Sequence, residues 1–372
     1  MDNKLYVGRP NMGDRDALLA RINDMLDRRW LSNNGPLVQE FEKNICKLLG
    51  VKHVVAMCNA TVALEIASKA LDLHGEVILP SYTFIATAHA LQWQGITPVF
   101  ADMEPESHNV DPAKIEALIS PRTSGIVGVH VWGRACETEA IEAIAAKHEL
   151  KVMYDASHGF GCSLRGRMLG NFGACEVFSF HATKFINCFE GGAVVTNDDA
   201  LAEKMRLMRN FGFKGFDNVV YLGVNGKMNE VSAAMGLTNL DAMDDIVDVN
   251  RRNYLAYREG LASVPGVSVL KYNDQEKNNY QYVVVEVDPD VCPRNRDDIV
   301  ADLHAENVIA RKYFWPGCHR MEPYRTVQPD AWKHLPETER IAARVIVLPT
   351  GQTVDEPTVR RVCEIIRRAA TA

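Results

Sequence analysis

Short apolar runs alternate with helix-length segments along the first half of the chain. Apolar and β-branched residues gather in runs of four to seven, and the intervening stretches place apolar residues three or four positions apart. The pattern predicts strands at Val51–Met57, Glu76–Leu79, Pro98–Ala101, Gly125–Val131 and Lys151–Tyr154, and helices at Val62–Leu71, Ile85–Trp93, Pro112–Ile119 and Glu137–His148. Strands separated by helices in this order indicate βαβ units and a mainly parallel sheet.

The second half begins with two closely spaced strand patterns, Cys175–Phe180 and Ala193–Thr196. The pattern then predicts a helix, a loop rich in Gly and Asn, and one long helix, at Asp199–Met208, Asn210–Asn229 and about Glu230–Leu261. A Pro-Gly turn at Pro265-Gly266 follows, and beyond it one strand and two helices are expected at Tyr280–Val287, Asp297–Glu306 and Pro357–Ala370. We therefore expect a large α/β domain over residues 1–263 and a smaller α+β domain over residues 264–372.

Composition narrows the class of protein. A chain of 372 residues, 47% hydrophobic and 24% charged, is long enough for two domains and typical of a soluble globular protein. The net charge of −7 argues against nucleic acid as a partner, since nucleic-acid-binding proteins usually carry a basic stripe. The first residues lack the apolar core of a signal peptide, and the longest uncharged stretch, Val77–Ala101, is too polar to span a membrane.

Cysteine and histidine usage points to a cytoplasmic enzyme without a metal. The nine cysteines are dispersed with no Cys-x-x-Cys pair, as expected of small buried residues in a reducing compartment. The eleven histidines are scattered and show no metal-ligand spacing. The sequence also lacks the glycine-rich dinucleotide and P-loop motifs, the H-E-x-x-H zinc motif and the G-x-S-x-G nucleophile elbow.

An aspartate and a lysine stand out from ordinary surface residues. Asp155 ends the apolar strand Lys151–Tyr154, and ligands of parallel sheets bind at the carboxyl ends of the strands. Alone, such an aspartate is as readily a helix cap. Lys184 follows an aromatic-rich strand and precedes Glu190-Gly191-Gly192, whose glycines allow close backbone approach to a ligand. A pyridoxal phosphate (PLP) enzyme needs this pair, an amine for the Schiff base and a carboxylate that keeps the pyridine nitrogen protonated.

A place for the cofactor phosphate is also visible. Asn59-Ala60-Thr61 separates a strand from a helix, and the N–H groups of a helix N-terminus bind anions. Many strand–helix turns look like this one, so the signal is weak alone. Ser179 could add a hydroxyl group, and Phe84 could stack on the pyridine ring, although Phe in such a helix is more often part of the core.

Taken together, these motifs resemble the nucleotide-sugar aminotransferases, the DegT-type group of fold-type-I PLP enzymes. The resemblance runs from Asn34-Gly35-Pro36 to Leu348-Pro349. It rests on Asn59-Ala60-Thr61-Val62-Ala63-Leu64, Pro80-Ser81-Tyr82-Thr83-Phe84, Pro98-Val99-Phe100-Ala101-Asp102, Asp155-Ala156-Ser157-His158, Ser179-Phe180-His181-Ala182-Thr183-Lys184, Glu190-Gly191-Gly192 and Gly223-Val224-Asn225-Gly226-Lys227-Met228-Asn229-Glu230. The family's fold is a three-layer α/β/α PLP-transferase domain, like that of aspartate aminotransferase, with a smaller C-terminal α+β domain.

The resemblance implies a role for each matching residue. Lys184 would be the Schiff-base lysine and Asp155 the partner of the pyridinium. His158 would lie beside the ring near its phenolic oxygen. The remaining implied cofactor contacts are Ala60, Thr61 and Ser179 at the phosphate, Phe84 on the ring, and Asn225 reaching the phosphate of the neighbouring subunit in a homodimer with shared active sites. The sequence departs from the usual Ser-Gly-Thr at Asn59-Ala60-Thr61, but Ala60 still supplies a backbone N–H.

The resemblance also narrows the reaction. Related 3-dehydratases carry His in place of the lysine, so Lys184 favours transamination, and retention of the whole cofactor set argues against a purely regulatory protein. The segments His181-Ala182-Thr183-Lys184 and Tyr313-Phe314-Trp315-Pro316-Gly317-Cys318-His319 resemble the branch that aminates the C4 ketone of 4-keto-6-deoxyhexoses. We expect glutamate as the amino donor, passage through pyridoxamine phosphate, and a dTDP-linked sugar as acceptor. A 3-keto sugar nucleotide, a GDP-linked sugar or a cyclitol such as scyllo-inosose stays open. Candidate substrate residues are Asn34, Gly35, Lys214, Lys227, Arg311, Tyr313 and His319.

Overall fold

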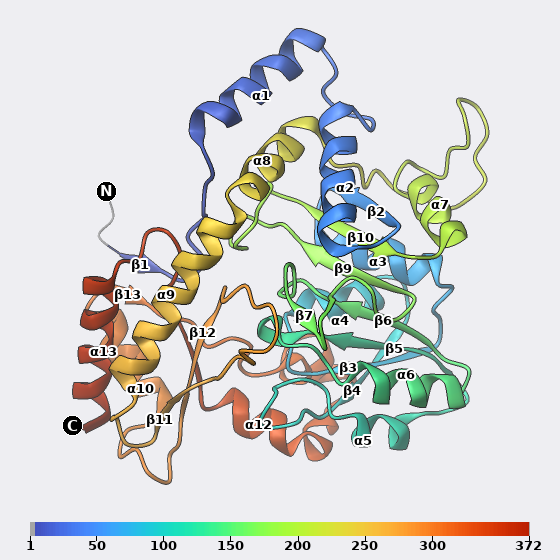
Figure 1. Ribbon diagram of the computed structural model, residues 1–372. Coiled ribbons are helices and arrows are strands. Elements are labelled where there is room, and N and C mark those ends of the chain that lie inside the picture. The colour runs from blue at the N-terminus through green and yellow to red at the C-terminus, as the bar shows by residue number, and fades with distance from the viewer. Residues whose placement is uncertain (1–3, 372) are drawn as a thin grey trace.

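A seven-stranded sheet in the order β2-β10-β9-β6-β5-β3-β4 forms the centre of the molecule (Figure 1). The structure is a computed structural model that describes residues 4–371, so residues 1–3 and 372, the outer ends of the two expected domains, lie outside the described residues. The strands are β2 (His53–Met57), β3 (Glu76–Pro80), β4 (Thr97–Ala101), β5 (Thr123–Val129), β6 (Lys151–Asp155), β9 (Cys175–Ser179) and β10 (Gly192–Thr196). In this sheet β10 runs antiparallel to both neighbours and the other pairs run parallel, which confirms the mainly parallel sheet.

Successive side chains of the strands face two different helical layers, because strand residues alternate between the faces of a sheet. In β2, Val54 and Ala56 pack in the cluster built with α2 (Pro36–Leu49) and α8 (Glu230–Asp241). Val55 and Met57 pack in the opposite cluster with α3 (Ala60–Ala70) and α7 (Asp199–Met208). The result is a three-layer α/β/α arrangement, in which α6 (Thr138–Lys147) extends the first layer and α4 (Ile85–Gln92) the second.

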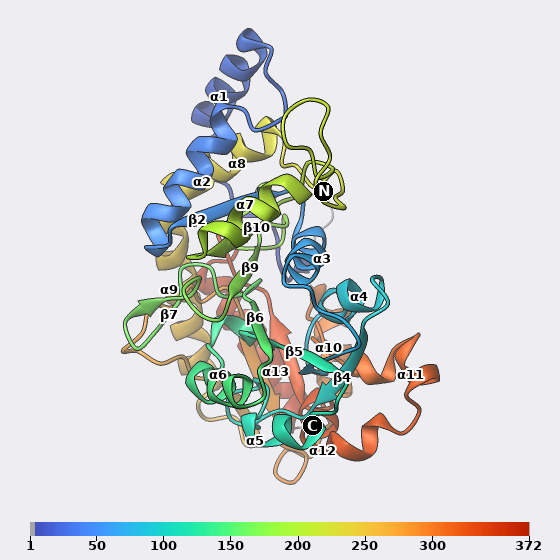
Figure 2. The same cartoon turned by 90° about the vertical axis from the view of Figure 1, so that its right-hand side faces the viewer.

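Two of the expected helices differ from the structure. The long helix expected at Glu230–Leu261 is broken at Ala242, whose φ of −100° and ψ of 11° end α8 and begin α9 (Met243–Leu261). The break lets α8 stay buried against α1 (Arg15–Arg28) and α2 while α9 turns toward the C-terminal elements (Figures 1 and 2). The helix expected at Pro112–Ile119 is α5 (Pro112–Ile115) continued by a tighter 3₁₀ turn over Glu116–Leu118.

A smaller antiparallel sheet, β11-β12-β14, carries the second core. Its strands are β11 (Val267–Val269), β12 (Val283–Val287) and β14 (Val345–Leu348), and α9, α10 (Arg296–Ala305) and α13 (Glu356–Thr371) pack on it. The remaining elements are β1 (Leu5–Tyr6) paired with β13 (Val308–Ile309), the hairpin β7 (Ser163–Leu164) and β8 (Arg167–Met168), α11 (Tyr324–Val327) and α12 (Pro336–Ala342). Since α9 and β1 both contribute to this C-terminal unit, the domain boundary near residue 263 stays a prediction.

None of the helices in residues 4–371 is long and apolar enough to cross a membrane.

Candidate active site

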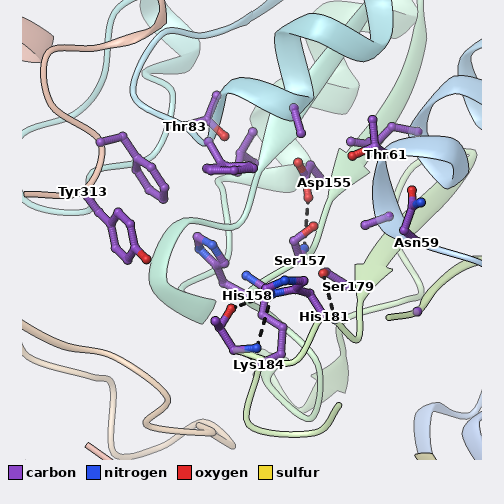
Figure 3. A pocket seen from close by; sticks show the side chains of 18 of the residues that line it. Asn59, Thr61, Thr83, Asp155, Ser157, His158, Ser179, His181, Lys184 and Tyr313 are labelled. Carbon is purple, nitrogen blue, oxygen red and sulfur yellow. Dashed lines mark hydrogen bonds between the residues drawn. The ribbon is translucent and has the colours of Figure 1, made fainter. Parts of the chain in front are cut away.

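One cavity of about 380 Å³ lies at the carboxyl ends of the parallel strands. Asn59 and Thr61 lie on one side of it and Tyr313 on the other, with His158 and Lys184 between them (Figure 3). The cavity is lined by most of the residues singled out from the sequence: Ala60, Thr61, Phe84, Asp155, His158, Ser179, Lys184, Arg311 and Tyr313. Arg311 and Tyr313 follow β13, and the Arg311 backbone pairs with Val347 of β14, whereas the other residues belong to the large sheet and its connecting segments, so the site lies where the large sheet meets the C-terminal unit.

Asp155 is the last residue of β6 and is 5% exposed. Its Oδ2 atom accepts a hydrogen bond from the Thr87 hydroxyl at 2.8 Å. Its Oδ1 atom accepts one from the Ser157 N–H at 3.0 Å (Figure 3). Both carboxylate oxygens are therefore held in place. A buried carboxylate with fixed orientation is suited to hold a proton on a cationic heterocyclic nitrogen.

Lys184 stands in the turn after β9, where its N–H donates to the His181 carbonyl at 2.8 Å. Its Nζ atom donates to the Tyr282 hydroxyl at 3.3 Å. Burial lowers the pKa of Lys184 from 10.5 to about 8, against the Asp155 carboxylate, which raises it. A larger fraction of this amine is thus neutral and nucleophilic near neutral pH than of a solvated lysine.

His158 is 5% exposed and packs beside two aromatic rings. Its ring lies parallel to those of Trp132 and Phe314, at centroid distances of 6.0 and 5.7 Å. Its Nδ1 atom accepts a hydrogen bond from the backbone N–H of Trp132 at 3.2 Å. Burial first, and then the nearby Lys184, lower the pKa of His158 well below its usual value, so the ring is neutral.

The N-terminus of α3 forms the other end of the cavity. The Asn59 side chain accepts a hydrogen bond from the Val62 N–H at 2.9 Å, which leaves the first N–H groups of the helix, those of Ala60 and Thr61, available to a ligand. The backbone of Gly192 packs closely against the start of α3. A side chain would not fit there, because a Cβ atom at residue 192 would lie 2.6 Å from the Ala60 nitrogen. Ser179 lines the cavity and pairs in the sheet with Gly192, next to this end.

The residues present fit PLP. One amine, one fixed carboxylate and one neutral imidazole surround a cavity that ends in an anion-binding helix N-terminus. Phe84 begins α4 beside them and is 56% exposed, so its ring is available for stacking. Among residues 4–371, no cluster of His, Cys, Asp or Glu could hold a metal ion.

The structure does not bring every candidate residue to this cavity. Asn225 is exposed in the loop between α7 and α8, and Lys214 is exposed in the same loop. Lys227 donates to the Asn210 side chain at 2.8 Å and lines a separate hollow together with Asn34. Gly35 caps α2, and His319 is buried between the Ser81 hydroxyl and Glu339.

Four residues of the site had not been singled out from the sequence. Thr87 lies one helical turn after Phe84, so helix periodicity could have placed it beside the cavity. Tyr282 lines the cavity from the residue before β12, and Trp132 contacts His158 from the turn after β5, and no local motif marks either of them. Phe314 belongs to the segment Tyr313–His319, but the resemblance assigns no role to its ring.

Comparison with known proteins identifies the group to which this site belongs. The model of the DegT/DnrJ/EryC1/StrS aminotransferase family matches residues 13–367. The chain belongs to this family. As a member of an aminotransferase family with the cofactor pocket described above, it is a PLP-dependent aminotransferase with an α/β fold of type I.

Individual members of the family match over nearly their whole length. The chain is 36% identical to dTDP-4-amino-4,6-dideoxy-D-glucose transaminase of Shigella dysenteriae, over 99% of both chains. It is 34% identical to GDP-perosamine synthase of Caulobacter vibrioides, over 96% of both. Among solved structures, DesI in the presence of its TDP-sugar product superposes with a TM-score of 0.95 at 51% identity, covering 100% of this chain and 94% of DesI.

Proposed function

We propose that this enzyme transfers the amino group of glutamate to the C4 ketone of a dTDP-linked 4-keto-6-deoxyhexose. The observation that carries the proposal is the position of Lys184 and Asp155 in one cavity, with an anion-binding helix N-terminus at its end. The names of the Shigella dysenteriae relative and of the DesI structure support a dTDP-linked sugar, since both act on or bind such a compound.

The side chains of the cavity would have different roles toward the cofactor. When bound, PLP carries the amino group between donor and acceptor and delocalises the negative charge that develops as a proton is lost. Asp155 would keep the pyridine nitrogen protonated, and the His158 Nε2–H would donate to the phenolic oxygen. Lys184 would anchor the cofactor and move the proton that the reaction relocates. Ala60, Thr61 and Ser179 would bind the phosphate, and Phe84 would cover the ring.

Arg311 is the cation best placed for the anionic substrate. It lines the cavity, and its guanidinium carbon stacks 4.7 Å from the centre of the Tyr313 ring. The stacking restrains the side chain at the cavity, and the planar guanidinium of Arg binds phosphate oxygens with bidentate geometry. We assign the nucleotide diphosphate to Arg311 and the adjacent sugar to the neighbourhood of Tyr313.

Asn225 and Lys227 fit the proposal only in a homodimer. The loop that precedes Asn225 exposes several apolar side chains, with Phe216 97% and Leu222 76% exposed. Exposed apolar clusters of this kind mark interaction surfaces. A second copy that covers this loop would bring Asn225 to the cofactor phosphate of its partner, so each cavity would be completed by both chains.

The cysteines support a reducing compartment, and we place the enzyme in the cytoplasm. All nine cysteines are free, and seven of them are buried.

The proposal is tested by following 2-oxoglutarate formed from glutamate with dTDP-, UDP- and GDP-linked 4-keto-6-deoxyhexoses and with scyllo-inosose. The dTDP-linked sugar should give the highest kcat/KM. Preference for the GDP-linked sugar would overturn the assignment of the nucleotide, and exclusive use of the cyclitol would overturn that of the sugar nucleotide.

A further inference from the structure

Trp132 adopts a backbone conformation that bulky residues rarely adopt. It lies in the turn after β5 with φ 63° and ψ 9°, in the left-handed region, although it is fully buried. His108 also has a left-handed conformation, with φ 62°. The two side chains meet, because the Trp132 indole N–H donates to His108 Nδ1 at 3.0 Å. Unfavourable conformations of this kind persist where surrounding contacts fix them, and they cluster at functional sites.

Neighbouring side chains hold this turn from two further sides. The side-chain oxygen of Asn109 accepts a hydrogen bond from the Val131 N–H at 2.9 Å, and its amide donates to the Arg134 carbonyl at 3.1 Å. The Tyr272 hydroxyl lies 2.9 Å from the Tyr282 carbonyl oxygen and 3.2 Å from the Trp132 carbonyl oxygen, and its single proton is shared between these two acceptors. The Val131 carbonyl, which shares a peptide group with the Trp132 N–H, accepts a hydrogen bond from the Arg134 N–H at 3.0 Å, so this peptide group is held in one orientation.

That orientation aims the Trp132 N–H at His158 Nδ1, 3.2 Å away. A neutral imidazole carries one proton, so a ring whose Nδ1 atom accepts must carry its proton on Nε2. The same reasoning applies to His108, which accepts the hydrogen bond from the indole N–H of Trp132. His108 Nδ1 accepts from Trp132, so His108 Nε2 carries the proton and donates to the Glu286 carboxylate at 2.9 Å. Glu286 lies on β12 of the C-terminal unit, with 23% of its side chain exposed.

We propose that Glu286, His108 and Trp132 form a positioning chain that fixes His158 as its Nε2–H tautomer. The inference rests on the proposed function, in which the Nε2–H of His158 donates to the cofactor. Each link requires the previous one: without an acceptor at Glu286, His108 is free to move its proton to Nδ1, and it then no longer accepts the indole N–H. Trp132 loses an anchor, relaxes from the left-handed region, and removes its N–H from His158. The His158 ring then presents a lone pair to the cavity in part of the molecules.

The test compares Glu286→Ala with Glu286→Gln. Glutamine keeps an acceptor oxygen for His108 and should restore the wild-type behaviour, whereas alanine removes the acceptor. The direct readout is the protonation of each His158 ring nitrogen in long-range ¹H–¹⁵N spectra of ¹⁵N-histidine-labelled enzyme, with and without PLP. The His158 signals are identified by their loss in His158→Gln. Glu203→Ala, which removes an exposed carboxylate on α7, is the control.

The wild type and Glu286→Gln should show Nε2 protonated and Nδ1 unprotonated. Glu286→Ala should give a mixture of tautomers, a shifted visible absorbance of the bound cofactor and a kcat lower by about tenfold at unchanged KM for the sugar nucleotide. Should Glu286→Ala fail to fold, Trp132→Phe removes the next link, the bond from the indole N–H to His108, and should have the same effects on His158. A wild-type His158 protonated on Nδ1, or a Glu286→Ala variant with wild-type His158 signals, would overturn the chain. Because these spectra need no substrate, failure of the proposed substrate would leave their result unaffected.

Discussion

The Nζ atom of Lys184 lies 3.3 Å from the hydroxyl oxygen of Tyr282, which joins the turn after β9 to the C-terminal unit. Burial raises the pKa of Tyr282 well above its usual value, so the phenol stays protonated and offers a neutral oxygen to the amine. Only the Asp155 carboxylate, among the causes of the shift, raises the pKa of Lys184. The site therefore favours the neutral amine more than a site with a direct ion pair would.

This environment predicts an unusual pH dependence for cofactor attachment. With a pKa of about 8, half of Lys184 is neutral at pH 8, whereas an ordinary lysine reaches that point near 10.5. The rate at which the apoenzyme develops the visible absorbance of bound PLP should therefore rise with pH and level off above about pH 9. In Asp155→Asn the midpoint should move lower, because the carboxylate raises the pKa. Lys184→Ala is the blank, and a midpoint near 10.5 would refute the interpretation.

Asp155→Asn should keep the fold and lose most of the rate. Asparagine retains an oxygen that can accept from Thr87 or Ser157, so folding should survive, but a neutral amide cannot hold the pyridine nitrogen protonated. We expect kcat to fall on the order of 100-fold or more with little change in KM, since the charge is needed only in the transition state. Steady-state kinetics measure the effects of the substitution on kcat and on KM separately. Unchanged kcat would make Asp155 a structural residue.

Shared sites are tested by mixing two inactive variants, Lys184→Ala and Asn225→Ala. If Asn225 acts in the partner's cavity, a mixed dimer has one site with both defects and one site with neither. Random exchange of equal amounts should then restore about one quarter of the wild-type activity. Exchange is verified with differently tagged chains. Proven exchange without recovery, or an active monomer, would contradict a shared site.

Arg311→Gln should weaken binding of the sugar nucleotide without affecting the donor. Glutamine cannot neutralise the diphosphate, so KM for the sugar nucleotide should rise about 10- to 100-fold, while the half-reaction with glutamate stays nearly unchanged. Lys312→Gln is the matched control, because Lys312 pairs with Asp297 and does not line the cavity. An equal loss in both half-reactions would place Arg311 at a group common to both substrates. Lys227→Gln tests the same diphosphate contact from the partner chain.

The sequence predicts well those parts of the protein that depend on local pattern. Strand–helix alternation locates the parallel strands, and the carboxyl end of β6 places Asp155 at the cavity. The sequence does not predict the break between α8 and α9, because the helical pattern continues from one helix into the next. The break at Ala242 coincides with a change in the elements against which the two helices pack.

The rest of the site depends on long-range packing that no local motif reveals. Tyr282 lies 98 positions from Lys184, and their contact exists only because β12 packs against the large sheet. The hydrogen bond from Trp132 to His158 requires a left-handed backbone that the sequence does not favour at a tryptophan. His319 is a residue that the resemblance suggests for substrate binding but that the structure uses elsewhere. Both of its ring nitrogens form hydrogen bonds within the protein, one with Ser81 and one with Glu339.

Transfer of a ¹⁵N label tests the proposed amination at C4 most directly. The holoenzyme would be incubated with ¹⁵N-glutamate and dTDP-4-keto-6-deoxy-D-glucose, and the isolated product examined by mass spectrometry and NMR. We expect one ¹⁵N atom per sugar nucleotide, bonded to C4, and none with Lys184→Ala. Label on C3, or label transferred only to a free cyclitol, would contradict it.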